Sequence, residues 1–358
     1  MIRLARTPTA VGLVALVVGS LLSIRVLSQV GWDPTVFVAF GTDATATTTY
    51  AEERLGEVSL RTGQGHDGKF FFVQAHDPLI LEPESNAQIL DHPLYRSQRM
   101  LYPLLAGGLG LFGSRTIAWA LLIVNLIAIG AGTHATARVA RFMGGSPWWG
   151  MAFAFNIGLL SEVIIGGAGV VAAALAFGAV AAVLDEDHRS GVILLVLSAL
   201  AREVFLITAL GTAWWLRRRG ERTRSWIILL VPVAAVGLWA AYLRFRIGWD
   251  VGVPDVQVFG PPFLGLMRAI PEWMDQPLNL VTGIGVLTLF VLYLRRTLIS
   301  NALVGWAFLG FVPLAFLLTD LVWVHYFDFS RAVAPVITAF VLMMFLGSRV
   351  PMQRSHLA

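Results

Sequence analysis

Long apolar stretches recur along the whole chain, and they limit the fold more than any other feature of the sequence. Residues 10–30 and 115–136 are two examples. Such stretches run for about 17 to 25 residues, the length that an α-helix needs to cross a hydrocarbon core about 30 Å thick. Of the 358 residues, 57% are apolar and 13% are charged, against about 25% charged residues in an average soluble domain. The sequence therefore predicts an all-α polytopic membrane protein, with residues 1–358 forming a single transmembrane domain.

Ten candidate spans follow from this pattern. They are residues 10–30, 115–136, 148–165, 167–184, 192–203, 204–216, 226–246, 278–294, 301–319 and 332–347. Short arginine-rich segments fall between alternate spans, and the positive-inside rule assigns them to the cytoplasm. They contain Arg3, Arg6, Arg138, Arg141, Arg189, Arg217, Arg218, Arg219, Arg222, Arg224, Arg295, Arg296, Arg349 and Arg354. We therefore expect about ten transmembrane helices, with both termini cytoplasmic.

Two features depart from this simple topology. Arg244 and Arg246 fall on the outer side, where the positive-inside rule does not favour them. Segments 192–203 and 204–216 are short for full crossings, so we interpret them as a broken hairpin whose corner reaches only partway out. The first span has no small-residue cleavage site after it, so we expect a retained anchor rather than a signal peptide.

The first segment outside the membrane, residues 31–114, is far too long for a simple turn. Residues 31–98 contain ten acids, and the runs "EVSLRT" and "KFFFVQA" favour strand or amphipathic pieces lying against the membrane surface. The run "GQGHDGKFFFVQAHDPL" at 63–79 gathers His66, Asp67, Lys69, His76 and Asp77 around three phenylalanines. Polar chemistry is thus expected on one face of the membrane, whereas a permeation path would need it spread through the bilayer.

Charged residues inside apolar runs are the next candidates, because such residues are costly in lipid and are usually paired or functional. Arg202 and Glu203 are adjacent in "SALAREVFL". Adjacent side chains on a helix point about 100° apart, so we expect Arg202 to face an anionic group from elsewhere; a mutual ion pair is the alternative. Glu162 precedes glycines that let another backbone or a ligand approach, and a polar helix end is the alternative there.

The outer start of the last span, "WVHYFDFSRAVAP", adds His325, Asp328 and Arg331. Interfacial anchoring by aromatic side chains explains Trp323 and Tyr326. It explains Arg331 less well, because that residue enters the outer edge of the membrane. We therefore add these three residues to the candidate site.

A short N-terminal anchor is followed by a long external loop with "HDGKFFFVQAHDP" and then by "HPLYRSQRMLYPLLAGGLGLFG". This order of features resembles the glycosyltransferase C superfamily. This is similar to the GPI-mannosyltransferase-like branch and to prokaryotic relatives with a D-G-x-[FY]-[FY] signature, and "AREVFL" at 201–206 is similar to their [RK]-E corner. Where many members carry a second acid, Asp67 is followed by glycine, which speaks against a metal pair of adjacent carboxylates.

The resemblance implies an integral protein of a prokaryotic plasma membrane with an extracytoplasmic active site. It implies a polyprenyl-phosphate sugar donor and an acidic catalytic residue in the first external loop, which matches Asp67. The acceptor is then a glycan, a lipid or a protein, and mannose is one candidate sugar. The net charge of +4 needs no nucleic-acid partner, because the arginines lie where membrane topology and contact with membrane lipids require them.

Glycosyl transfer needs a base for the acceptor hydroxyl and cations for the departing phosphate. Asp67 is the candidate general base, and a turn aspartate before Gly68 is the alternative. Arg96 and Arg99 lie three apart, on one face if the segment is helical, and their forked donors suit a phosphate; anchoring to anionic lipids is the alternative. Lys69 either contacts phosphate or pairs with an acid. The candidate substrate-binding residues are His66, Lys69, Arg96, Arg99, Tyr102, Glu162, Arg202, Glu203, His325, Asp328 and Arg331.

The cofactor stays unknown from the sequence. The chain has no cysteine, which excludes disulfides, iron–sulfur clusters and thiolate metal sites. His66 and His76 have no regular ligand spacing, so a divalent metal is neither required nor excluded. Two other functions stay open: a polymerase or ligase acting on lipid-linked oligosaccharides, and a transporter, although no internal repeat of the kind found in transporters is evident.

Overall fold

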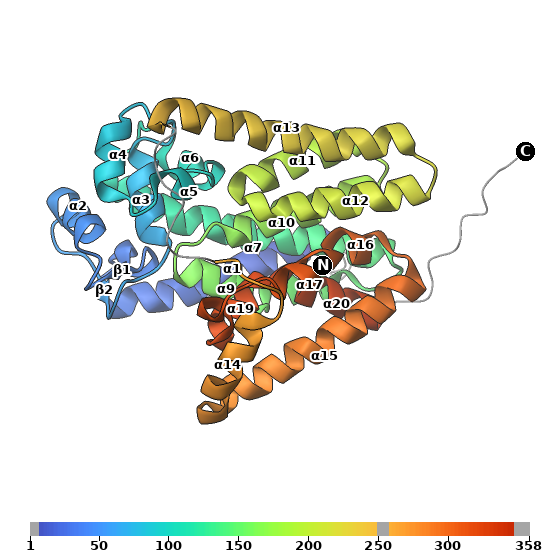
Figure 1. Cartoon of the computed structure of the whole chain (residues 1–358). Coiled ribbons are helices and arrows are strands. Elements are labelled where there is room, and N and C mark those ends of the chain that lie inside the picture. Colours follow the sequence, from blue (N-terminus) through green and yellow to red (C-terminus); the bar gives the residue numbers. More distant parts are fainter. Residues whose placement is uncertain (1–6, 249–257, 347–358) are drawn as a thin grey trace, which may run out of the picture.

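The computed structural model describes residues 7–248 and 258–346, and within these ranges the chain is almost entirely helical (Figure 1). Four helices of the described part are long and apolar enough to cross a membrane: α1 (Pro8–Gln29), α7 (Ser114–Phe142), α13 (Arg222–Ile247) and α15 (Pro277–Ser300). A fifth span results if α19 (Tyr326–Ala332) and α20 (Ala334–Leu346), which meet at a bend of 69°, count as one. The terminal arginines Arg3, Arg6, Arg349 and Arg354 lie outside the described residues.

The other apolar segments form shorter helices. They are η3 (Pro147–Gly150), α8 (Met151–Ala154), α9 (Ile157–Ile164), α10 (Gly169–Leu184), α11 (His188–Ala201), η4 (Glu203–Phe205), α12 (Leu206–Arg218), α14 (Leu264–Asp275), α16 (Leu303–Leu309), α17 (Phe311–Ala315) and α18 (Asp320–Trp323). The expected helical membrane class is therefore confirmed, while only four of the ten predicted spans are continuous helices of spanning length in the described residues. The predicted span 148–165, for example, is divided among η3, α8 and α9.

The long helices present apolar side chains to the outside. Leu13 and Leu21 on α1 are 56% and 60% exposed, and Leu238 on α13 is 73% exposed. Only 17% of the most apolar window of α13 is buried within the protein, against 56% for α7, which runs through the middle of the bundle. Apolar surface of this extent needs a covering layer, and hydrocarbon supplies one. These faces identify an integral membrane protein.

The segment 31–114 folds into a compact cap at one end of the bundle (Figure 1). Its elements are η2 (Pro34–Phe37), β1 (Phe40–Gly41), α2 (Thr45–Leu55), β2 (Leu60–Arg61), α3 (Gly68–His76), α4 (Pro83–Ile89), α5 (Pro93–Arg96) and α6 (Leu101–Gly107). β1 and β2 pair in parallel, with Phe40 opposite Leu60, so "EVSLRT" does contain a short strand.

The run "KFFFVQA" does not lie on a surface as a strand or amphipathic piece. It forms α3, in which every residue from Gly68 to Ala75 is buried. The Phe72 ring packs edge-on against Phe40, and the Phe71 ring against Tyr102. The prediction was wrong because phenylalanines on successive helix faces find aromatic partners on both sides, a fact that local periodicity cannot show.

α13 joins the cap to the opposite end of the bundle. Near its C-terminus, Tyr242 donates to the Leu79 carbonyl at 2.6 Å, and Arg246 donates through Nε to the Ile80 carbonyl at 2.9 Å. Its N-terminus begins at Arg222, beside the arginine-rich turn after α12. At 1.5 Å per residue, this helix is about 39 Å long. The position of Arg246 beside the cap thus has a local cause, because backbone carbonyls of the cap accept hydrogen bonds from its guanidinium.

The predicted corner between two short apolar segments is present. α11 ends at Ala201, Arg202 is extended with φ −158° and ψ 113°, and α12 begins at Leu206 after the single turn η4. Each of the two helices is about 20 Å long, half the length of α13. The corner therefore stops partway along the bundle and lies beneath the cap, where α6 packs against α11.

The arrangement predicts that the cap and the arginine-rich turn face opposite sides of the membrane. Thr49 in α2 and Arg222 at the start of α13 are both exposed, so single cysteines there should react with an impermeant thiol reagent from opposite sides. The chain has no native cysteine to interfere. Labelling of both positions from the same side of sealed vesicles would contradict the arrangement.

Candidate functional site

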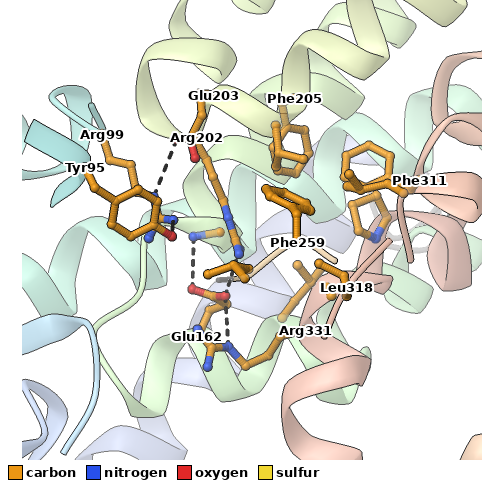
Figure 2. A pocket seen from close by; sticks show the side chains of 17 residues that line it. Tyr95, Arg99, Glu162, Arg202, Glu203, Phe205, Phe259, Phe311, Leu318 and Arg331 are labelled. Atoms are coloured by element: carbon orange, nitrogen blue, oxygen red, sulfur yellow. Dashed lines mark hydrogen bonds and ion pairs between the residues drawn. The ribbon is translucent and has the colours of Figure 1, made fainter. Parts of the chain in front are cut away.

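Charged side chains from four distant segments meet where the cap, the corner, α9 and α19 come together. Figure 2 shows the part of this cluster formed by Arg99, Arg202, Glu203, Glu162 and Arg331. Asp67 from the cap joins it through its ion pairs with Arg99 and Arg331. We call these six residues, together with Arg96, Asp91 and Asp328, the ion network.

Asn156 sets the position of α9, which carries Glu162. Its side-chain oxygen accepts from the Gly158 N–H at 2.9 Å, and its Nδ2 donates to the Ala334 carbonyl at 2.8 Å. Gly158 lies so close to α19 that a Cβ there would come within 2.1 Å of the Ser330 carbonyl oxygen. α9 is therefore capped and held against the bend between α19 and α20 by the same asparagine.

Glu162 is the most deeply buried acid of the ion network, with a side chain 3% exposed. Its Oε1 accepts from Arg202 at 3.2 Å and from Arg331 at 3.1 Å, while its Oε2 accepts from the Gly169 N–H at 3.0 Å. A Cβ on Gly167 would come within 1.8 Å of Oε2. The glycines after Glu162 thus make room for its own carboxylate at the start of α10, where free backbone N–H groups favour an anion.

Asp67 lies immediately before α3 and is surrounded by guanidinium groups. Arg96 reaches its Oδ1 at 3.0 Å, and Arg99 and Arg331 reach its Oδ2 at 3.4 and 3.7 Å. Arg96 ends α5, while Arg99 lies in the turn before α6. The two arginines therefore do not lie on one face of a single helix, which is where a helical segment would have put them. They converge on one carboxylate nevertheless.

These arginines determine the protonation of Asp67. Burial alone would raise the pKa of this carboxyl, but the charges of Arg99, Arg96 and Arg331 outweigh it and hold the pKa well below its usual range. The ion pairs therefore stabilise the fold at any pH above the ordinary pKa of aspartate, and this stabilisation is lost only as the pH falls through the lowered value. A carboxylate held in this way is also a weak proton acceptor at neutral pH.

Three further ion pairs complete the ion network. Arg96 reaches Asp91 at 2.8 Å, Arg331 reaches Asp328 at 3.1 Å, and the Nε of Arg99 lies 3.5 Å from Glu203. Seven of the predicted substrate-binding residues therefore meet around Asp67. They are Arg96, Arg99, Glu162, Arg202, Glu203, Asp328 and Arg331.

The structure does not bring Tyr102 or Lys69 into this cluster. Tyr102 is fully buried and its hydroxyl donates to the Leu121 carbonyl at 2.9 Å. The Nζ of Lys69 donates to the Gln64 carbonyl and lies 4.8 Å from the Phe70 ring centre. Lys69 makes no ion pair with an acid in the described residues, because its side chain lies within the cap.

The candidate histidines lie outside the ion network. The ring of His66 is 6.2 Å from that of Phe327, and burial together with the charge of Arg331 lowers its pKa, so the imidazole is neutral at pH 7. His325 is exposed where α19 begins. His76, at the C-terminal end of α3, forms a hydrogen bond between its Nε2 and the Ser114 Oγ, 2.8 Å apart. Among the described residues no cluster of three or more potential metal ligands occurs.

A pocket opens beside the ion network, with a charged side and an apolar side (Figure 2). Its charged side is formed by Arg99, Glu162, Arg202, Glu203 and Arg331. Its apolar side includes Leu159, Val204, Phe205, Val258, Phe259, Phe311, Leu314 and Leu318.

Tyr95 and the apolar side of the pocket were not predicted from the sequence. Tyr95 lines the pocket, and its hydroxyl accepts from Arg99 at 2.8 Å. Its place beside two candidate arginines in "YRSQRMLYP" is a signal that could have found it. Phe259 reaches the pocket by pairing with Leu318 as an isolated β-bridge, and no local pattern indicates such a contact.

Comparisons of the chain with protein-family models, with curated proteins and with solved structures give no match.

The tight contact behind Asp67 gives a test of the cap. The Gly68 N–H donates to the Ile165 carbonyl at 3.1 Å, and a Cβ at Gly68 would lie 2.4 Å from the Val38 carbonyl oxygen. Gly68→Ala should therefore destabilise the protein by about 1 to 3 kcal/mol, the usual cost of overpacking. Gly237→Ala is the control, since a Cβ there meets open space. Thermal unfolding in detergent measures both, and equal melting temperatures would contradict the packing described.

Proposed function

We propose that this protein is a membrane glycosyltransferase that moves a sugar from a polyprenyl-phosphate donor to an acceptor. The observation that carries the proposal is the pocket with one charged and one apolar side (Figure 2). A polyprenyl-phosphate sugar has the same two parts, an anionic phosphate and a long hydrocarbon chain. Mannose is a candidate sugar, and a glycan, a lipid or a protein is the acceptor.

The distribution of charge supports binding of an anion at the pocket. The whole ion network has five carboxylates against four guanidinium groups, whereas the pocket side alone has three guanidinium groups and two carboxylates. Positive charge is therefore concentrated beside the cavity. Arginine suits this task because its planar fork matches the oxygens of a phosphate.

The apolar wall supports a lipid rather than a soluble ligand. Phe205 and Phe311 pack edge-on with their ring centres 5.2 Å apart, and Phe259, 55% exposed, lies across the cavity from Arg99. An exposed aromatic next to a charged recess favours a ligand that is apolar at one end. A hydrocarbon chain can lie on this wall while its phosphate faces Arg202 and Arg331.

The proposed topology follows from the arginine-rich turns. We place the turn after α12 in the cytoplasm by the positive-inside rule, which assigns the cap and the ion network to the extracytoplasmic side. About ten crossings with both termini cytoplasmic remain the proposal for the whole chain. The shorter helices α11 and α12 then form a re-entrant hairpin, a structure tolerated at membrane depth where it lines a cavity.

The arginines give a direct test of donor binding. Arg99→Ala should weaken the affinity for a polyprenyl phosphate on the order of 10- to 100-fold, because a charge-assisted hydrogen bond contributes about 1.5 to 3 kcal/mol. The measurement is binding of a short-chain polyprenyl phosphate to the purified protein in nanodiscs. Arg218→Ala, at the far end of α12, is the matched control and should bind normally. Unchanged affinity in both Arg99→Ala and Arg202→Ala would refute the donor site.

A further inference from the structure

We infer that Glu203, rather than Asp67, accepts the proton of the acceptor hydroxyl. The inference rests on the proposed glycosyl transfer and concerns the division of work among the three carboxylates nearest the pocket: Asp67, Glu162 and Glu203. It follows from which of them has an oxygen that a hydroxyl can approach.

Asp67 and Glu162 have their oxygens occupied. Arg96 donates to Oδ1 of Asp67, and Arg99 donates to Oδ2. Glu162 accepts from two arginines at one oxygen and from a backbone N–H at the other. A base must offer a lone pair to the incoming proton. Guanidinium groups on these oxygens make both carboxylates weaker proton acceptors, and Asp67 is not among the residues that line the pocket.

Glu203 is held much more loosely. Its one ion pair within the described part of the chain is with Arg99, at 3.5 Å from Nε. Neither Glu203 Oε2 nor Arg99 Nε has a hydrogen-bond partner there, although both atoms are buried. The side chain as a whole is 29% exposed and lines the pocket. The other oxygen, Oε1, is not buried and accepts no hydrogen bond in the described residues, so an acceptor hydroxyl can approach it from the pocket.

The corner directs this side chain. Because Arg202 is extended, it and Glu203 point in different directions: Arg202 reaches down to Glu162, while Glu203 points toward Arg99 (Figure 2). The Phe205 N–H donates to the Arg202 carbonyl at 3.0 Å and closes the turn. Neighbouring residues thus form two different parts of the wall of the same cavity.

The proposed step is a displacement at the anomeric carbon. The acceptor oxygen forms a bond to that carbon, and the bond from the carbon to the phosphate oxygen breaks. The polyprenyl phosphate leaves with the electron pair, stabilised by Arg202 and Arg331. The hydroxyl proton passes to the Glu203 carboxylate. No oxidant, reductant or further reactant is needed.

Asp67 is then a positioning residue. It contacts Arg96, Arg99 and Arg331 together, and it fixes their guanidinium groups at the edge of the pocket. Its loss should weaken donor binding first, because the arginines lose the charge that orders them. If Asp67 were the general base, its substitution would have the opposite effect: turnover would be lost while donor affinity stayed intact.

The test compares Glu203→Gln with Asp67→Asn in sugar transfer from a panel of polyprenyl-phosphate sugars, with the affinity for polyprenyl phosphate measured separately. Glu203→Gln should lower kcat by about 10²- to 10⁴-fold, as expected for losing a positioned acid–base group, and leave donor affinity within about threefold of wild type. Asp67→Asn should lower donor affinity on the order of tenfold or more. Glu221→Gln, in the turn between α12 and α13, is the matched control and should leave both quantities unchanged.

Glu203→Asp keeps the carboxylate and provides a second variant should the Gln variant fold poorly, which thermal unfolding reports. Its turnover should lie between those of wild type and Glu203→Gln. Near-normal turnover in Glu203→Gln, or lost donor binding in it, overturns the inference while wild-type transfer still supports the proposed function. Absence of transfer by the wild-type protein with every donor overturns both.

Discussion

Glu162 carries its charge at a site where only 3% of the side chain is exposed, and burying an unpaired carboxylate costs several kcal/mol. Its partners therefore have to be in place: Arg202 from the corner, Arg331 from α19, and the N–H of Gly169 at the start of α10. Removing either arginine leaves the buried charge only partly compensated, which is more costly than losing a surface pair. This requirement fixes α9, α10, the corner and α19 to one another, and the pocket lies beside them.

Interrupted helices and the site occur at the same place for a physical reason. Each break frees backbone groups that lipid cannot satisfy, so non-helical backbone is tolerated only inside protein or beside a cavity. Asn156 meets this need at two breaks, capping α9 and donating to the Ala334 carbonyl where α19 meets α20. The break at Arg202 lines the pocket. The interruptions that shorten the predicted spans are thus the positions from which charged side chains reach the cavity.

The sequence could predict the helical membrane class, the corner at Arg202 and the set of arginines, because each depends on local composition and on the high cost of charge in lipid. It could not predict that α3 is a buried helix, since that depends on Phe40 and Tyr102 from other segments. Nor could it distinguish the roles of Asp67 and Glu203. The number of guanidinium groups around each carboxylate is set by four segments distant in sequence, and no spacing rule encodes it.

Burial also explains why the positive charges of the site come from arginine rather than lysine. Lys69 is the only lysine among the 26 basic residues, and burial lowers its pKa, so an ammonium group in this setting holds its proton less firmly. Burial also disfavours the charged form of Arg99, yet the nearby Glu203 and Asp67 raise its pKa above the usual range. A guanidinium thus keeps its charge more firmly than an ammonium group, and its several N–H donors can bond two acids at once. Arg331 does this with Glu162 and Asp328. A site that must hold positive charge for a phosphate inside a membrane protein is therefore best built from arginines ordered by acids, which explains why so many carboxylates surround a pocket proposed to bind an anion.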